Sequence, residues 1–215
     1  IDKGIHIAYH PKQNGVVELK SLDFSKRAQF FVNAVPEIRE NDWADHLRGA
    51  AKMLGEKYRL KIGLSGVIEG SLPIGGLSSS AAVIISFLTA LCRVNEITLG
   101  YQELIDTAQA AEREYVGVAC GKLDQSCEVL SKKDCLLHLD TRDGTFEWIP
   151  TPDGMKPYKI GIFFSGLERS LKNSRYNLRQ DECKAAAYAL LGYAGMEYGT
   201  FEDTRLRDVP FEVFT

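Results

Sequence analysis

Apolar and polar positions alternate with a two-residue period at the start of the chain. The pattern covers residues 4–10 (GIHIAYH) and 16–22 (VVELKSL), with Pro11 and the turn-forming pair Asn14-Gly15 between them. Alternation of this kind is typical of strands, and a short turn between two such runs is typical of antiparallel neighbours. The pattern therefore predicts a β-hairpin over residues 4–22.

Helical spacing dominates the middle of the chain. From Asp42 to Leu54 a potential N-cap is followed by apolar residues three and four apart, and Gly55 comes after the last of them. This pattern predicts an amphipathic helix. Further helices are expected at residues 79–95 and 101–115, near Leu123, and from about Asn173 past Tyr188. The helix at 79–95 is apolar nearly all round and is expected to be buried.

Alternation returns in four later segments. Leu60, Ile62 and Leu64 lie on one face of a predicted half-buried strand that begins at Arg59. Three more strands are expected at residues 134–140, 145–150 and 158–165. Strands and helices are mixed without a regular βαβ alternation. The expected fold class is therefore α+β, with an antiparallel or mixed sheet and helices on one side.

Composition restricts the possible partners. The chain has 215 residues, 45% of them apolar, so it can bury a substantial core, and its formal net charge of −3 gives no basic bias toward nucleic acid or an anionic membrane. The longest nearly uncharged apolar window, residues 81–92, is well below the roughly 20 residues that span a bilayer. A small soluble ligand is the expected partner, with no nucleic acid and no membrane.

Cysteine usage points to a reducing compartment. Five cysteines occur without a C-x-x-C pair, and their spacing fits neither a disulfide framework nor a zinc site. The N-terminus lacks the layout of a secretory signal. We therefore expect reduced thiols and a cytoplasmic location. Cys120 is expected to be structural and not a nucleophile, because no histidine is near it in the sequence.

Residues 71–82 (SLPIGGLSSSAA) stand between the strand that begins at Arg59 and the buried helix. Glycines let backbone N–H groups approach a ligand, and the first turn of a helix has unpaired N–H groups with partial positive charge. Serine hydroxyls add donors, and oxygens that suit magnesium. The segment is thus a candidate phosphate site, with a plain turn and a serine N-cap as the alternative. Neither G-x-x-x-x-G-K-[ST] nor G-x-G-x-x-G occurs.

The same segment resembles a known phosphate loop. PIGGLSSSAA is similar to P-x-G-x-G-L-S-S-[SA]-A of the GHMP small-molecule kinases, although it has one residue fewer between Pro73 and Leu77. Residues 43–49 resemble the W-x-x-Y-x-x-G helix of galactokinases, with His46 in place of Tyr. Residues 111–125 resemble A-E-x-x-[FY]-x-G-x-x-C-G-x-M-D-Q, and residues 170–183 resemble S-L-x-x-[SA]-x-Y-x-x-R-[RQ]-x-x-C. The chain is thereby identified as a member of the GHMP kinases, most similar to galactokinases.

The resemblance implies a domain organisation and an activity. Residues 1–165 would form the N-terminal, ATP-binding domain, and residues 166–215 the start of the C-terminal domain. The family's R-x-N-[LI]-[IL]-G-E-H-x-D-Y segment and its C-terminal glycine-rich motif are not found, so the chain is expected to be an internal fragment without activity alone. The implied reaction transfers the ATP γ-phosphoryl group, with Mg²⁺, to a sugar hydroxyl, expected to be the anomeric one of galactose or a related sugar.

Two other readings stay open at this point. A sugar or ATP sensor of the same fold could have lost turnover, and the loop that is one residue short favours this mildly. A GHMP kinase for another sugar is also compatible with the motifs. The sequence gives no indication of the oligomeric state.

Asp124 is the expected catalytic base. It matches the aspartate that galactokinases place beside the anomeric hydroxyl, and it lies at the start of a predicted helix, where the helix dipole favours a negative charge. A helix N-terminal carboxylate without a catalytic role is the alternative, and the surrounding CGKLDQ segment favours the catalytic reading.

The resemblance implies the remaining roles. Trp43 would lie against the adenine, with a core position as an equal alternative, and Mg²⁺ would be bound by Ser80 and Glu112. The residues expected to hold the ATP phosphates are Gly75, Gly76, Leu77, Ser78, Ser79 and Ser80. The residues expected to contact the sugar are Gly121, Asp124 and Tyr176.

Overall fold

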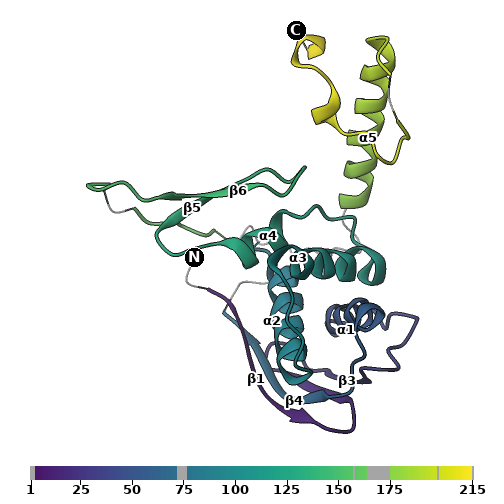
Figure 1. Cartoon of the computed structure of the whole chain (residues 1–215), viewed down its shortest axis with the longest axis vertical. Coiled ribbons are helices and arrows are strands. Elements are labelled where there is room, and N and C mark those ends of the chain that lie inside the picture. The colour runs from purple at the N-terminus through teal and green to yellow at the C-terminus, as the bar shows by residue number, and fades with distance from the viewer. Residues whose placement is uncertain (1–2, 72–76, 157, 164–174, 198, 215) are drawn as a thin grey trace. The chain divides into compact units, whose positions relative to one another are not determined.

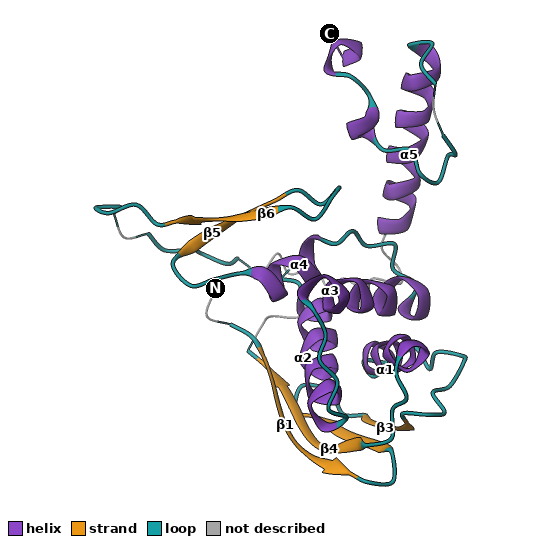
Figure 2. Cartoon of the chain, viewed as in Figure 1, coloured by secondary structure: helices purple, strands orange, loops and turns teal. Residues whose placement is uncertain are grey.

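The computed structural model describes residues 3–71, 77–156, 158–163, 175–197 and 199–214. The chain divides into two compact units, residues 1–168 and 169–215. The first unit combines a mixed sheet with helices packed on one side of it, as Figures 1 and 2 show. The predicted α+β class is therefore confirmed.

The main sheet has four strands in the order β1-β4-β2-β3. Strand β1 (Ile5–Lys12) is antiparallel to β4 (Gly63–Gly70), which is parallel to β2 (Val16–Ser21). Strand β3 (Arg27–Phe31) is antiparallel to β2 and ends the sheet. Strand β4 is thus central, and the loop that follows it leads to helix α2.

The predicted hairpin of β1 and β2 is wrong, although both strands exist. The turn forms, with the Gly15 amide donating to the Lys12 carbonyl at 3.2 Å, but β4 lies between the two strands. A Cβ added to Gly63 would lie 2.1 Å from the Val16 carbonyl oxygen, and one on Gly66 would lie 2.0 Å from that of Ala8. These glycines let β4 fit closely between its neighbours, and its backbone satisfies the facing edges of both.

The helices of the first unit follow the predicted spacing. They are α1 (Asp45–Lys57), α2 (Ser79–Val94), α3 (Tyr101–Ala110) and α4 (Leu123–Leu130). Helix α3 continues into a π-helical segment, η1 (Ala111–Val116), which the sequence pattern did not predict. Helix α2 packs on β1 and β4 and also contacts α1, α3 and α4, so it is central to the unit.

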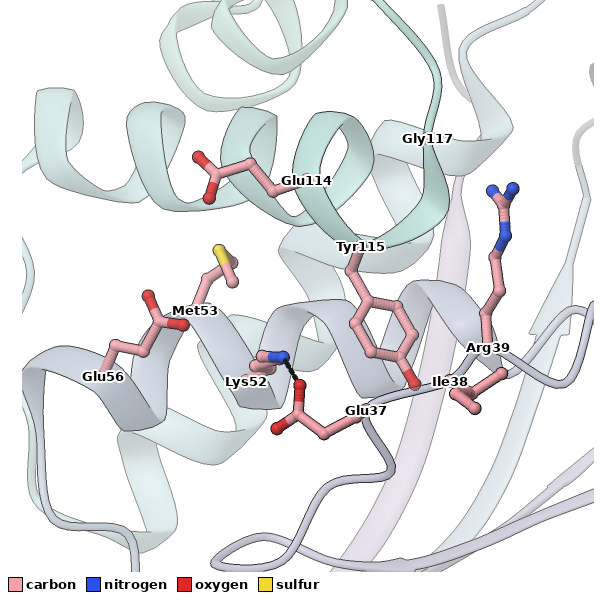
Figure 3. A pocket seen from close by; sticks show the side chains of 9 residues that line it. All are labelled: Glu37, Ile38, Arg39, Lys52, Met53, Glu56, Glu114, Tyr115 and Gly117. Carbon is pink, nitrogen blue, oxygen red and sulfur yellow. Dashed lines mark hydrogen bonds and ion pairs between the residues drawn. The ribbon is translucent and has the colours of Figure 1, made fainter.

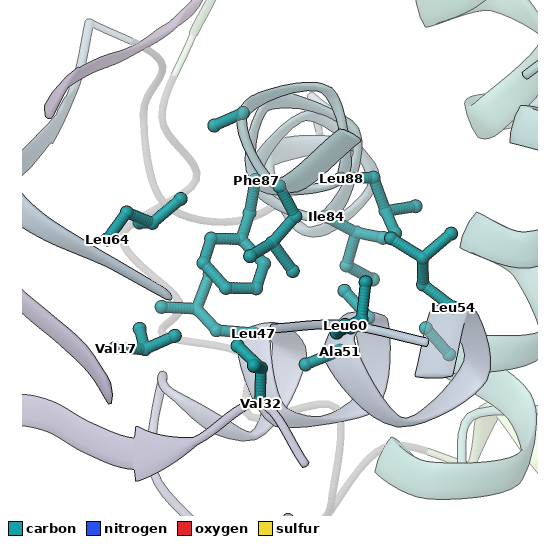
Figure 4. Close-up of a cluster of buried hydrophobic side chains, with 14 of the residues drawn as sticks. Val17, Val32, Leu47, Ala51, Leu54, Leu60, Leu64, Ile84, Phe87 and Leu88 are labelled. Carbon is teal, nitrogen blue, oxygen red and sulfur yellow. The ribbon is translucent and has the colours of Figure 1, made fainter. Parts of the chain in front are cut away.

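The core fixes α2 between the sheet and α1 (Figure 4). Phe87 and Leu88 of α2 are fully buried, as are Leu47 of α1 and Leu64 of β4. Burying side chains of this size stabilises the folded state by about 1.5–3 kcal/mol each before the entropic cost is subtracted. Because α2 is held along its length, its N-terminal serines have a defined place.

Strands β5 (Cys135–Leu139) and β6 (Phe146–Pro150) form where strands were expected, and they pair antiparallel. The strand expected at residues 158–165 is absent over 158–163, and residues 164 and 165 lie outside the described part of the chain. Residues 158–163 are exposed and pair with no strand among the described residues. Alternation alone does not make a strand, because a strand also needs a neighbour for its backbone hydrogen bonds.

The described residues of the second unit form helix α5 (Tyr176–Tyr193) and the 3₁₀ turns η3 (Leu206–Asp208) and η4 (Phe211–Phe214). Ala187, Leu191 and Val209 form its small buried cluster. Across both units, no described helix has the length and apolar character that a membrane span requires.

Candidate active site

The N-terminus of α2 provides a place for an anion. Ser78 has a left-handed backbone (φ +57°), and its carbonyl accepts the Ala82 amide at 3.1 Å, so the helix begins there abruptly. Leu77, Ser78, Ser79 and Ser80 are half-buried, and the first turn carries no acidic side chain. The unpaired N–H groups and positive dipole end of a helix start favour phosphate. Gly75 and Gly76 lie outside the described residues.

Ser80 and Glu112 lie side by side although 32 positions separate them. The Ser80 hydroxyl donates to Oε1 of Glu112 at 2.8 Å, and Glu112 is 4% exposed. Ser80 comes from the first turn of α2 and Glu112 from η1. π-Helical turns are rare and often occur at functional sites, because they change the direction of side chains within a helix. The two residues expected to bind magnesium are therefore in contact.

Gln125 completes this group, and the sequence had suggested no role for it. Its Nε2 donates to Oε2 of Glu112 at 2.8 Å, and the side chain is fully buried. Each oxygen of the Glu112 carboxylate thus accepts one hydrogen bond. The only signal in the sequence was the position of Gln125 directly after Asp124 in CGKLDQ.

Asp124 lies in the first turn of α4, and its side chain is half-buried. Burial, together with the charge of Asp124, raises the pKa of Glu128, one turn further along the helix. Gly121 is exposed, and a Cβ added there would meet nothing within 4 Å, so its backbone is open to a ligand. Gly121 and Asp124 thus belong to the same short segment, and both are at least partly exposed.

The loop that precedes Asp124 is held against α3 and η1. The Cys120 carbonyl accepts hydrogen bonds from Gln109 Nε2 at 3.2 Å and Arg113 Nη1 at 3.1 Å. Burial, with the nearby charge of Glu112, raises the pKa of the Cys120 thiol to about 12. A thiol with so high a pKa stays protonated near pH 7, which agrees with a structural role.

Trp43 packs against the main core, and Tyr176 belongs to the second unit. The Trp43 indole donates to the Lys26 carbonyl at 2.8 Å, stacks on Phe24 with ring centroids 6.3 Å apart, and packs against the main core. Its predicted contact with adenine stays a prediction. Tyr176 begins α5 in the second unit and is 46% exposed, so its predicted contact with the sugar also stays a prediction.

A separate cleft of about 550 Å³ lies between α1 and η1 (Figure 3). An ion pair between Lys52 and Glu37 lies in it, and the exposed Glu114 borders it. Among the described residues, none of those predicted for the kinase site lines this cleft. Its charged groups are of both signs, so it shows no preference for an anionic nucleotide.

The chemistry of the Ser80–Glu112 pair fits magnesium. A hydroxyl and a carboxylate are hard oxygen ligands, and Mg²⁺ in nucleotide sites commonly takes one or two protein ligands while phosphates and waters supply the rest. Within the described residues, no group of three His, Cys, Asp or Glu side chains is placed to hold a metal by itself. The pair therefore fits a metal that arrives with a nucleotide.

Comparison with known proteins agrees with this geometry. Residues 45–132 match the family model of the GHMP kinases N-terminal domain. The chain is 35% identical to the galacturonokinase of Arabidopsis thaliana, over 91% of this chain and 51% of that protein. It is 36% identical to the galactokinase of Pyrococcus furiosus, over 76% of this chain and 46% of that protein. The chain spans about half the length of the curated relatives it matches.

A solved structure supports the same relationship. The crystal structure of Lactococcus lactis galactokinase complexed with galactose superposes with a TM-score of 0.87 at 25% sequence identity, covering 100% of this chain and 54% of the other. The family match spans α1 through α4, the elements that carry Ser80, Glu112 and Asp124. Residues 45–132 are therefore similar to the N-terminal domain of the GHMP kinases, and the fold of the chain is similar to that of galactokinase.

Proposed function

We propose that the chain forms the nucleotide- and magnesium-binding part of a sugar kinase that transfers the γ-phosphoryl group of ATP to a hydroxyl of galactose or a related sugar. The observation that carries the proposal is the hydrogen-bonded series Ser80–Glu112–Gln125, which joins α2, η1 and α4 at one buried point. Relatives named galactokinase and galacturonokinase support the same reaction class.

Different residues of the chain have different roles in the proposed reaction. The helix start at Ser78–Ser80 receives the phosphates, and Ser80 and Glu112 hold Mg²⁺. Bound Mg²⁺ neutralises charge on the transferring phosphoryl group. Asp124 accepts the proton of the sugar hydroxyl while the sugar oxygen forms a bond to the γ-phosphorus. The bond from that phosphorus to the β–γ bridging oxygen breaks, and ADP leaves with the electron pair.

The two sugars named for the relatives define the acceptor class. Galactose and galacturonate share the ring hydroxyls and differ at C6, which is a hydroxymethyl group in one and a carboxylate in the other. Gly121 precedes Asp124 by three positions, and its open backbone leaves room for a ligand. Both sugars therefore belong in the assay.

The test is a phosphotransfer assay with MgATP and each sugar on the full-length protein, because this chain alone is expected to be inactive, and it follows ADP and sugar phosphate. Asp124→Asn should lower kcat by about 10²–10⁴-fold, the usual contribution of a general base, and leave MgATP binding unchanged. Glu114→Gln serves as the control, because Glu114 is an exposed carboxylate on η1. A protein that binds MgATP and a sugar but forms no sugar phosphate would contradict the kinase and favour a sensor.

A further inference from the structure

Gln125 is fully buried and contacts the carboxylate proposed to bind magnesium. A carboxylate only accepts hydrogen bonds, so the amide must turn its Nε2 toward Oε2 of Glu112. With Nε2 directed toward Glu112, the direction of Oε1, the carbonyl oxygen of the same amide, is fixed as well. Oε1 of Gln125 is a buried acceptor, and it has no hydrogen-bond partner in the part of the chain that the structure describes.

Asn95 shows what a purely structural amide looks like in this protein. Its Nδ2 donates to the carbonyls of Ile62 at 2.9 Å and Leu91 at 3.0 Å. Its Oδ1 accepts the amides of Lys61 and Ile62, both at 2.9 Å. Both the donor and the acceptor of the Asn95 amide therefore form hydrogen bonds within the fold. In Gln125 only the donor, Nε2, does so among the described residues.

A buried acceptor without a donor is costly, and such groups in native proteins usually serve a ligand, a water or a reaction. A magnesium ion bound with a nucleotide keeps several water ligands, and these are strong donors. Partners of metal ligands commonly fix the orientation of those ligands.

We propose that Gln125 is a positioning residue for the metal site. Its Nε2 holds Oε2 of Glu112, so that Oε1 of Glu112 stays directed toward Ser80 and the ion. Its own Oε1 accepts a hydrogen bond from a water that the ion carries. This inference rests on the proposed function, because it requires a magnesium nucleotide at Ser80 and Glu112.

The test measures binding of Mn²⁺ in the presence of ATP, following free Mn²⁺ by electron paramagnetic resonance. Gln125→Met keeps the volume of the side chain and removes both polar atoms. It should weaken Mn²⁺ binding by about 10–100-fold, the usual effect of losing such a partner. ATP binding in the presence of EDTA should be unchanged. The control is Gln102→Met, since Gln102 is an exposed amide on α3.

A double-mutant cycle separates positioning from general support of the fold. The part of the effect that passes through Glu112 should disappear in a Glu112→Gln background, so Gln125→Met should weaken Mn²⁺ binding less there than in the unaltered protein. Full additivity, or an unchanged Mn²⁺ affinity in Gln125→Met, would overturn the inference and leave the kinase proposal intact. If the unaltered chain binds no Mn²⁺ with ATP, the kinase proposal fails and the inference fails with it.

If Gln125→Met does not fold, a second variant is needed to test the inference. Gln125→Asn keeps the amide but shortens the side chain by one methylene, so its donor no longer reaches Oε2 of Glu112. Thermal unfolding identifies the folded variants before binding is measured. Weakened Mn²⁺ binding by a folded Gln125→Asn supports the inference, and unweakened binding contradicts it.

Discussion

At the scale of single residues, Arg48 is the most heavily buried charge among the described residues of the first unit. It is 1% exposed, and its guanidinium lies 2.8 Å from Asp45, 2.9 Å from Asp42 and 3.1 Å from Glu40. A buried cation is tolerated only when its donors meet acceptors of opposite charge. These pairs tie the start of α1 to the loop before it.

The cluster predicts how stability depends on pH. Burial acts to raise the pKa of Asp42, but hydrogen bonds from Lys26 and Arg48 outweigh it and hold that pKa below its usual 3.8. A lowered pKa in the folded state means that ionised Asp42 stabilises the protein above the ordinary value. That contribution is lost as the pH falls below about 4. Urea denaturation between about pH 6 and pH 3 should show the loss.

Asp42→Asn provides the comparison for this effect. The variant should be less stable than the unaltered protein near neutral pH, and the difference should shrink as the pH falls. Two curves that stay parallel through this range would show that Asp42 does not contribute.

At this scale the sequence predicted some contacts and missed others. Similarity to a family motif indicated Ser80 and Glu112, and their hydroxyl and carboxylate do meet. Gln125 was missed because its role depends on which half of an amide faces Glu112, and no one-dimensional pattern carries that information. The Trp43 bond to the Lys26 carbonyl likewise depends on how a distant loop returns to α1.

At the scale of elements, α1 and η1 approach each other closely because Gly49 has no side chain. A Cβ on Gly49 would lie 2.9 Å from the Ala111 carbonyl oxygen and 3.0 Å from Cβ of Tyr115. Gly49 is the glycine of the segment that resembles W-x-x-Y-x-x-G. The packing gives a physical reason for a glycine there, since η1 carries Glu112.

Two substitutions on the same helix test this packing. Gly49→Ala should destabilise the fold by about 1–3 kcal/mol, because the added methyl group overpacks the contact with η1. Gly55→Ala should stabilise it by about 0.5–1 kcal/mol, because its Cβ would meet nothing closer than 3.8 Å and alanine favours helix. Urea denaturation of both variants gives the comparison, and equal effects would contradict the argument.

Local patterns predicted most elements but not their partners. Two-residue alternation located β1 and β2, yet their pairing depends on β4, whose residues come much later in the chain. The π-helical turn at η1 keeps the amphipathic pattern of α3 and differs only in its backbone hydrogen bonds. Residues 158–163 alternate like a strand but pair with none in the described part of the chain.

At the scale of the whole molecule, each compact unit has its own buried cluster. The main cluster draws on residues between Val17 and Ala111, and the cluster of the second unit consists of Ala187, Leu191 and Val209. A unit with a core of its own can fold independently.

A shortened chain should therefore retain the first unit. Residues 1–168 alone should unfold in urea in a single cooperative transition with a fixed near-ultraviolet circular dichroism spectrum, because none of the residues of the main core is removed. A gradual transition, with strong binding of a hydrophobic dye before denaturant is added, would show that the second unit is needed.

The central position of β4 has a consequence for how the protein is made. Strands β1 and β2 leave the ribosome before β4, but β4 (Gly63–Gly70) is the strand that joins them. Their inner edges therefore stay unpaired until that later segment has been synthesised and has entered between them. Closing such a long loop before any pairing is gained slows folding. Strands β1 and β2 are thus synthesised before the strand that pairs with both of them, and in that interval a chaperone would protect their edges.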